Sequence, residues 1–407
     1  MAENVDYDAI IVGGGPIGTR VAAQVARSGH STLVLEEHGD IGRPVQCAGL
    51  VTLRVLEMTG YDRPLNRIKG AEIFPPGGER LSFKADVPKA VAIDRADFDV
   101  YMAGRARDGG AEVRTGAAAT SAGYLSNGKE CTGRCAGPKE VRVGLADGTS
   151  LTCRLLVGAD GIKASVSRWF GLPRAKDIVS CYERRYTGLR GPSDMVSIFV
   201  GRDVAPNFFA WVIPQGSGEG LVGIGVSDGA MSAKQYLERL SGNSVLSRYL
   251  DGASVTEELA GAIPLGVVSR ISTDNVMVVG DAAGQVKPMS GGGLFSGLTC
   301  ADHCASAAIK ALDKGDVSAK ALSRYGAACE KDVHKELLKG LRLRKVFKKL
   351  DDAQLDELAR ILSEEDMLGL IISVGDIDNP SVLATRMLRR MPSLVRFSGP
   401  YLRSFLS

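Results

Sequence analysis

The sequence predicts an α/β protein: a parallel sheet covered by helices, interleaved along the chain with a mostly antiparallel sheet, and followed by a helical C-terminal region. Three observations predict this class. A strand, a glycine-rich turn, a helix and a second strand follow one another over residues 6–37. Four extended runs rich in β-branched and aromatic residues lie within residues 178–264. Basic amphipathic segments fill residues 331–407.

The N-terminal segment, residues 6–37, reads DYDAIIVGGGPIGTRVAAQVARSGHSTLVLEE and is typical of the βαβ unit of a Rossmann fold. Each glycine of its turn has a physical task. Gly13 permits the tight turn, Gly15 lets the backbone approach a pyrophosphate, and Gly18 lets the helix pack close to the strand. The start of the helix adds free amide hydrogens and a positive dipole, so the unit predicts a dinucleotide site.

The second strand of this unit ends on an acid, Glu36. A carboxylate at this place can accept hydrogen bonds from a ribose diol. Such an acid favours an unphosphorylated ribose, so FAD or NAD is expected rather than NADP. A glycine-rich turn alone is common, but here both strands, the helix and the acid stand where dinucleotide binding needs them.

Length and charge limit the function classes. A chain of 407 residues exceeds one ordinary core, so two interleaved domains and a tail are expected. Lys and Arg total 50 against 47 acids, and this balance gives no reason to expect nucleic-acid binding. No signal peptide precedes the first strand, and no apolar run reaches the ~18 residues of a membrane span. We therefore expect a cytoplasmic protein.

The chain has eight cysteines, and free buried thiols are expected in a protein of this size without a secretion signal. Cys131 and Cys135 lie in a glycine-rich loop and could form a metal or redox pair. Two thiolates are too few for a structural zinc or iron–sulfur site unless Cys153 or Cys181 joins them, so no metal is expected. Cys300 and Cys304 are read as small residues in a packed helix.

Two segments after the βαβ unit could contact a bound ligand. In the loop of residues 39–51, Cys47, Ala48 and Gly49 leave small side chains that would let a flat ring approach, although an irregular connection with a buried cysteine has the same composition. Arg95 follows Asp94, the expected cap of the next helix. A cation is unfavourable in a first helical turn, so a ligand phosphate or ring edge would explain it, as would simple solvation.

A third ligand-facing segment spans residues 275–312. Its strand ends on Asp281, which can bond a second ribose or a polyol, and its helix begins near Leu294. The amides of Gly293 and Leu294 suit an electron-rich ring that becomes anionic on reduction. Two phosphate-friendly helix starts with one glycine fingerprint fit a single large cofactor that lies across the sheet.

The expected antiparallel sheet contains aromatic residues that could contact a substrate. The motif PPGG within residues 66–94 predicts a hairpin, and the runs within residues 178–264 predict further strands. Phe209 and Trp211 share one face of a strand because side chains alternate with period two. They either fill a core or form a wall for a long apolar substrate.

The tail is strongly basic. Residues 331–349 hold eight Lys or Arg against two acids, with leucines between them. Such segments can lie on anionic lipid headgroups, cover the protein's own core, or bind an acidic partner protein.

With these residues set out, the chain resembles the geranylgeranyl reductase family of FAD-dependent oxidoreductases, within the wider group that includes aromatic flavin hydroxylases. The matching motifs, which span nearly the whole chain, are GGGPIG with Glu36, PVQCAGL, DRADFD, GADG, FFAWVIPQG and GDAAGQVKPMSGGGL. The resemblance implies FAD contacts from Gly18, Glu36, Cys47, Ala48, Gly49, Arg95, Asp281, Gly293 and Leu294. It also implies a substrate motif, usually Tyr-x-Trp-x-Phe-Pro, that is filled here by Phe209, Trp211, Ile213 and Pro214.

The resemblance implies three regions. We place an FAD-binding domain at residues 1–65, 95–177 and 265–330, and a substrate-binding sheet domain at residues 66–94 and 178–264. A basic helical region follows at residues 331–407. Family members saturate isoprenoid chains of archaeal membrane lipids or of the chlorophyll tail. An isoprenoid lipid substrate is therefore expected, with reduced FAD giving hydride to an alkene and Cys47 as a candidate proton donor.

Two other functions stay open at this point, a flavin-dependent aromatic monooxygenase and an electron carrier of the electron-transfer flavoprotein–quinone type. No second glycine fingerprint for NADPH is visible, so ferredoxin as well as NAD(P)H is a candidate electron donor. The basic tail is compatible with peripheral contact at a membrane surface.

Overall fold

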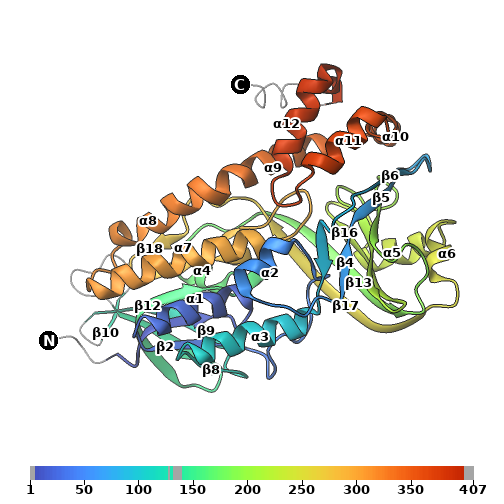
Figure 1. The fold of residues 1–407 in the computed structure, drawn as a ribbon. Coiled ribbons are helices and arrows are strands. Elements are labelled where there is room, and N and C mark those ends of the chain that lie inside the picture. Colours follow the sequence, from blue (N-terminus) through green and yellow to red (C-terminus); the bar gives the residue numbers. More distant parts are fainter. Residues whose placement is uncertain (1–4, 127–128, 132–139, 398–407) are drawn as a thin grey trace.

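The predicted parallel sheet forms the centre of a nine-stranded sheet (Figure 1). The computed structural model describes residues 5–126, 129–131 and 140–397. Its parallel strands lie in the order β8 (Glu112–Arg114), β2 (Thr32–Leu35), β1 (Tyr7–Val12), β12 (Ser150–Gly158) and β19 (Val276–Val278). Because these strands run the same way, their carboxyl ends meet at one edge, where parallel α/β sheets bind ligands.

Strand β12 belongs to two kinds of ladder. Its first half pairs antiparallel with β11 (Glu140–Leu145), and its second half pairs parallel with β1. The antiparallel part continues through β9 (Ala119–Ser126) to β10 (Lys129–Cys131), and β18 (Ser272–Thr273) pairs with β19. Strand β9 lies between β10 and β11, so these strands are antiparallel but do not follow one another in chain order as in a β-meander. Asp147 and Gly148 form the tight turn between β11 and β12.

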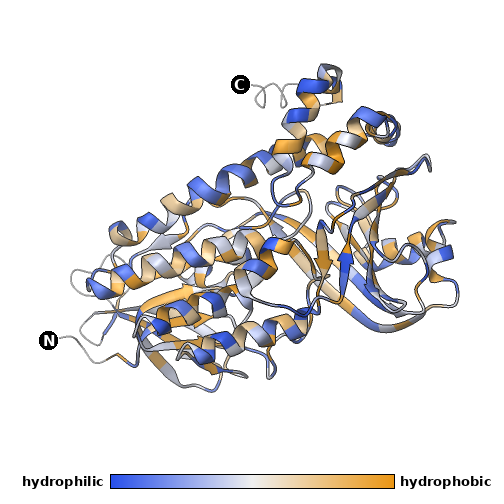
Figure 2. Ribbon diagram, viewed as in Figure 1, coloured by the Kyte–Doolittle hydropathy of each residue, from blue (hydrophilic) through white to orange (hydrophobic). Residues whose placement is uncertain are grey.

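Helices α1 (Pro16–Arg27), α3 (Arg95–Asp108) and α7 (Leu294–Asp313) pack beside one another over the parallel strands. Figure 2 shows the strands beneath them in orange, as expected for a sheet buried on both faces. Ile10, Ile11, Leu33 and Leu155 are fully buried there. Asp94 caps α3 by accepting a hydrogen bond from the Asp97 amide, which confirms the predicted helix start.

The second sheet has seven strands, in the order β17 (Ser254–Leu265), β13 (Asp177–Thr187), β16 (Glu219–Val226), β15 (Ala210–Gly216), β14 (Met195–Phe199), β5 (Gly70–Phe74) and β6 (Leu81–Lys84). All neighbours are antiparallel except β14 and β5. The hairpin predicted around PPGG is β5–β6. Helices α5 (Ala233–Ser241) and α6 (Leu246–Leu250) complete this part, and α5 packs on β13 and β16.

A small third sheet connects the two large ones. It consists of β3 (Leu50–Val51), β7 (Ala90–Ala92) and β4 (Asn66–Ile68), and α2 (Leu53–Thr59) follows its first strand. Short 3-10 turns, η1 (Gly161–Lys163) and η2 (Gly280–Ala283), follow β12 and β19, and α4 (Ser165–Trp169) comes after η1.

The C-terminal region is helical, as predicted. After α8 (Ala319–Cys329) it contains a π-helical turn, η3 (Glu330–His334), then α9 (Lys335–Phe347), α10 (Asp352–Leu362), α11 (Glu365–Val374), α12 (Pro380–Arg390) and the 3-10 turn η4 (Pro392–Phe397). Helices α10 and α11 contact the edge strand β6, and α12 contacts α9 (Figure 1). Within the described ranges, no helix has the length and apolar character that crossing a bilayer requires.

Candidate active site

One cavity of about 840 Å³ receives residues from both large sheets and from the C-terminal helices. Most residues predicted from the sequence to bind cofactor or substrate line it: Gly13, Gly15, Glu36, Cys47, Ala48, Gly49, Arg95, Asp281, Gly293 and Leu294, together with Phe209, Trp211 and Ile213. Gly18 and Pro214 do not line it. The cavity therefore joins the dinucleotide-binding edge of the first sheet to the aromatic strand of the second.

The glycine turn before α1 leaves room where a phosphate would lie. Gly15 is the N-cap of α1 and has no side-chain cap, so the first amides of the helix are available. A Cβ on Gly15 would meet no atom within 4 Å, whereas one on Gly13 would lie 2.2 Å from the Ala159 carbonyl oxygen. A Cβ on Gly18 would lie 2.2 Å from the Gly13 carbonyl oxygen. Gly18 thus packs the helix against the turn and makes no wall of the cavity.

Glu36, at the end of β2, is held by the turn that it faces. Its Oε2 accepts a hydrogen bond from the Gly14 amide at 2.8 Å, and its Oε1 accepts one from the His38 amide at 3.0 Å. The Nδ1 atom of His38 lies 2.6 Å from the same Oε1. These contacts fix the carboxylate at the cavity wall, where hydroxyl groups of a ribose could add further hydrogen bonds.

Arg95 lies at the cavity wall but is also paired, which the sequence did not lead us to expect. Its guanidinium bonds Asp99, one helical turn later, at 3.0 Å, and the two side chains are 14% and 13% exposed. Burial lowers the pKa of Arg95, but the charge of Asp99 and the sulfur of Cys47 outweigh it and raise the pKa overall. The spacing of Arg95 and Asp99 in DRADFD was the available signal, since residues four apart meet on a helix.

The second helix start, at α7, faces the same cavity. Gly293 is its N-cap and carries no side-chain cap, so amides at this end are also available. Burial raises the pKa of Asp281, and the charge of Arg95 opposes the rise. The loop between them is fixed by Ser296, whose hydroxyl donates to the Gln285 carbonyl at 2.6 Å.

The aromatic wall comes from the start of β15. The rings of Phe209 and Trp211 meet edge to face at 5.9 Å, and Phe208 stacks on Phe209 at 4.3 Å. Apolar side chains of neighbouring strands extend this wall, among them Val196, Ile198 and Phe83. Pro214 lies one residue beyond Ile213, is buried in the strand, and accepts a hydrogen bond from Asn66 at 2.9 Å.

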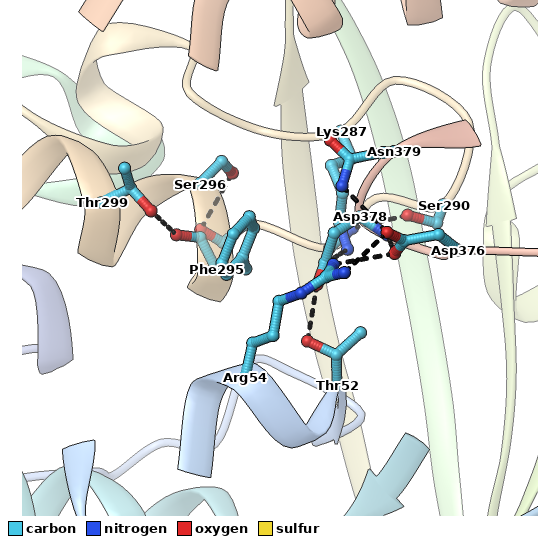
Figure 3. Close-up of polar contacts among 12 residues, drawn as sticks. Thr52, Arg54, Lys287, Ser290, Phe295, Ser296, Thr299, Asp376, Asp378 and Asn379 are labelled. Carbon is cyan, nitrogen blue, oxygen red and sulfur yellow. Dashed lines mark hydrogen bonds and ion pairs between the residues drawn. The ribbon is translucent and has the colours of Figure 1, made fainter. Parts of the chain in front are cut away.

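The C-terminal helices close part of the cavity, a role that the sequence did not reveal. Ile371, Ile372, Ile377 and Leu383, all on or between α11 and α12, line it. Their loop is held by hydrogen bonds and ion pairs, shown in Figure 3. Asp378 accepts hydrogen bonds from Lys287 and from Thr52, each at 2.6 Å, and Arg54 pairs with Asp376 at 2.9 Å.

Among the described residues, six cysteines are free thiols. Cys153, Cys300, Cys304 and Cys329 of these are buried, as predicted, whereas Cys47 is exposed and Cys181 is partly exposed. Cys131 is disulfide-bonded, so the expectation of free thiols was wrong for this residue. Cys135 lies outside the described residues.

These residues fit FAD on the evidence of their own geometry. Two uncapped helix starts face one cavity, an acid follows the second parallel strand, and the space at Gly15 is open. Glu36 and the turn at Gly15 would hold the adenosine and pyrophosphate part, and Asp281 with the start of α7 the remainder.

Comparison with known proteins agrees with this geometry. An FAD-binding domain family matches residues 6–180, and the geranylgeranyl reductase catalytic domain matches residues 177–255. A digeranylgeranylglycerophospholipid reductase of Methanothermobacter thermautotrophicus is 33% identical over 401 residues, which cover 96% of this chain and 98% of that protein. The enzyme of the same name from Methanocaldococcus jannaschii is 30% identical over 399 residues, with 96% and 97% covered.

Solved structures of other proteins are similar to this one along almost the whole chain. A geranylgeranyl bacteriochlorophyll reductase-like protein of Thermoplasma acidophilum superposes with a TM-score of 0.84 at 25% identity, covering 98% of this chain and 99% of that one. A flavin-dependent brominase, at a TM-score of 0.71 and 14% identity over 95% of this chain and 99% of its own, shares the fold. The chain therefore belongs to the geranylgeranyl reductase family and is an FAD-dependent oxidoreductase.

Proposed function

We propose that this protein saturates isoprenoid C=C double bonds of membrane-lipid precursors, with a digeranylgeranylglycerophospholipid as substrate. The observation that carries the proposal is the shared cavity, in which the dinucleotide-binding edge of one sheet meets an aromatic and aliphatic wall of the other. A long hydrocarbon chain would bury its apolar surface against that wall. Relatives that are named for this activity match along almost the whole chain.

The roles of the site residues follow from their positions. When bound and reduced, FAD supplies the hydride for the alkene. Gly13, Gly15 and Glu36, which line the cavity, would hold its nucleotide half, and Cys47, Ala48 and Gly49 would form a small-residue wall for its ring. Phe209, Trp211 and Ile213 orient the isoprenoid chain and keep water away from the reacting carbons, which an unpolarised alkene requires.

The missing tyrosine of the usual motif limits what the wall can do. Phe209 stands at that position, so no hydroxyl is available there, and Ile213 replaces a second ring. An apolar wall survives both changes, whereas any proton must come from another residue.

The test is anaerobic. The FAD-loaded protein, reduced with dithionite, is incubated with a digeranylgeranylglycerophospholipid in detergent micelles, and the mass of the lipid is measured by mass spectrometry. We expect the mass of H₂ to be gained for each reduced double bond, with no gain when FAD is left out. A hydroxylated aromatic product formed only with oxygen, or quinone reduction without any change in lipid mass, would favour the monooxygenase or the electron carrier instead.

For the electron donor we propose a small acidic protein of the ferredoxin type, with NAD(P)H as the alternative. The net charge of +3 and the basic segment of residues 331–349 support an acidic partner through electrostatic attraction. Anaerobic stopped-flow reduction of the bound flavin by reduced ferredoxin, NADPH and NADH distinguishes these donors. If NADPH or NADH reduces the flavin faster than ferredoxin does, the proposed ferredoxin-type donor is contradicted.

We also propose peripheral contact of the basic C-terminal region with a membrane surface, since the substrate would reside there. Amphipathic basic helices bind anionic headgroups through charge and buried apolar area. Sedimentation with vesicles tests this contact: binding to anionic but not to neutral vesicles is expected at low salt, and equal binding to both would contradict it.

A further inference from the structure

Saturating an alkene needs a proton as well as a hydride, and this inference rests on the proposed function. Several side chains that can carry a proton line the cavity, and Cys47 and Glu183 are among them. Cys47 is exposed and interacts with the Arg95 guanidinium. Glu183, on β13, was not singled out from the sequence, yet it faces the same cavity beside the aromatic wall.

Three adjacent strands bring Glu183 to Trp211. In the register of the sheet, Glu183 of β13 stands opposite Gly223 of β16, and Gly223 stands opposite Trp211 of β15. Because Gly223 has no side chain, the indole lies across the middle strand: a Cβ there would be 2.5 Å from its Cε2 and Cζ2 atoms. The indole Nε1 reaches over and donates a hydrogen bond of 2.6 Å to Glu183 Oε2.

This hydrogen bond leaves the second carboxyl oxygen for another use. Among the residues that the structure describes, Trp211 is the one hydrogen-bond donor to the Glu183 side chain. Glu183 is only 5% exposed, and buried carboxyl groups are normally paired with cations or several donors. A single neutral donor does not compensate a full negative charge, so the site favours the protonated acid.

The groups around Glu183 also leave its pKa raised. The pKa of Glu183 is raised to about 7: burial raises it most, the Trp211 hydrogen bond and the charge of Arg185 lower it, and the charge of Glu257 raises it. Arg185 is itself engaged by Glu257 at 3.2 Å and by Gln215. Burial also raises the pKa of the nearby cavity-lining thiol, Cys181, to about 12, so that group stays a neutral neighbour.

We propose that Glu183 is the catalytic acid that donates the proton to the substrate double bond, and that Trp211 holds its carboxyl group toward the cavity. The Glu183 O–H bond breaks as one C–H bond forms, and the hydride from the reduced cofactor forms the other C–H bond. Together they add one H₂ across C=C, and the cofactor is oxidised by two electrons. The Glu183 carboxylate, stabilised by the indole N–H, then takes a proton back from solvent.

The first test measures the oxidative half-reaction, in which substrate reoxidises the prereduced flavin without oxygen. The Glu183→Gln variant keeps an oxygen that accepts from Trp211 but cannot release a proton. We expect it to be slower by about 10²–10⁴-fold, the range for losing a general acid. In the wild type the rate should fall as the pH rises through about 7, the pKa of Glu183, because the acid form disappears.

The matched control is Glu72→Gln. Glu72 is also 5% exposed and lies on β5 of the same sheet, but it bonds Tyr249 and Arg80 and does not line the cavity. Its variant should keep the rate and the pH profile. The Cys47→Ala variant tests the alternative proton donor. A large rate loss there, together with a normal rate in Glu183→Gln, would assign the proton to the thiol and overturn the proposal.

The second test does not depend on turnover. The chain has two tryptophans, so ¹⁵N-tryptophan labelling gives two indole N–H signals, and the Trp169→Phe variant assigns them. We expect the Trp211 signal to titrate with a midpoint near pH 7, the pKa of Glu183, and to lose this step in the Glu183→Gln variant. A Trp211 signal with no titration step around that pH, or a pH limb that persists in Glu183→Gln, overturns the proposal.

Different results would contradict the proposed function and the proposed role of Glu183. If the wild type reduces no prenyl lipid with any donor, the proposed function fails while the Trp211 titration can still succeed. If the wild type reduces the lipid and Glu183→Gln does so equally fast, the function stands and the role of Glu183 is lost.

Discussion

At the scale of single residues, missing side chains shape this site as much as present ones do. Gly223 gives the Trp211 indole its place across β16, and Gly225 does the same for Phe208, whose Cδ1 would lie 2.4 Å from an added Cβ. Both aromatic rings therefore lie against a strand that carries glycine beneath them. The wall and the Glu183 contact depend on this arrangement.

A Gly223→Ala variant tests the arrangement directly. The new methyl group must displace the indole, so the hydrogen bond to Glu183 should break. Overpacking should also lower the free energy of unfolding by about 1–3 kcal/mol, and the thermal midpoint should fall with it. Thermal unfolding and the Trp211 indole N–H signal report the two effects. Gly123→Ala on β9 is the control, because its Cβ meets nothing within 4 Å. An unshifted Trp211 signal in Gly223→Ala would contradict the packing argument.

The cavity-lining residues that the sequence pointed to include two that follow a strand end. Glu36 and Asp281 were found because parallel strands deliver their last residues to one edge. Glu183 was not found, since YERRY mixes charged and aromatic residues and is typical of a half-exposed strand. Its burial arises from the register of three strands, which no local pattern reveals.

At the scale of elements, the first βαβ unit is the best-determined part of the fold. Its second strand, Thr32–Leu35, runs up to the acid Glu36, as expected, and α1 begins within the glycine turn. By contrast, β17 was not predicted, because its sequence SVTEELAGAIPL mixes acids, glycine and proline. Pairing with β13 along almost its whole length makes it a strand.

The close approach of α1 to its turn gives a prediction for Gly18. In a Gly18→Ala variant the Cβ would lie 2.2 Å from the Gly13 carbonyl oxygen, so the helix must move away. We expect weaker FAD retention, measured as flavin absorbance per protein after gel filtration, and a lower thermal midpoint. Gly104→Ala, in α3 with no atom within 4 Å, should instead raise stability by up to about 1 kcal/mol. Full FAD retention by Gly18→Ala would refute this account of the turn.

At the scale of the whole molecule, the tail is part of the enzyme body. Arg344, only 2% exposed, pairs with Asp177 at 3.0 Å and lies over the Phe208 ring. Lys348 pairs with Asp228 at 2.9 Å. These two cations of the basic segment face the seven-stranded sheet, so this part of the tail covers the protein's own core, one of the three uses that its composition allowed. The composition could not choose, because ion pairs between distant segments leave no local pattern.

The loop between α11 and α12 should hold the tail in place. In an Asp378→Ala variant the Lys287 ammonium, whose side chain is 9% exposed, loses its carboxylate partner. Leaving such a charge unpaired typically costs about 3–5 kcal/mol. We expect a lower thermal midpoint and faster protease cleavage after α11. The Asp366→Ala control breaks a surface pair with Arg390, in which both side chains are more than half exposed, and should cost at most about 1 kcal/mol. Equal losses in the two variants would argue against the buried clamp.

The closing helices also set an order of events during biosynthesis. Both sheets and the glycine turn come from the earlier part of the chain, whereas Ile371, Ile377 and Leu383 leave the ribosome near the end. A nascent chain can therefore assemble its nucleotide-binding edge before the hydrocarbon chamber has its last wall. The chamber is completed only when translation is nearly finished.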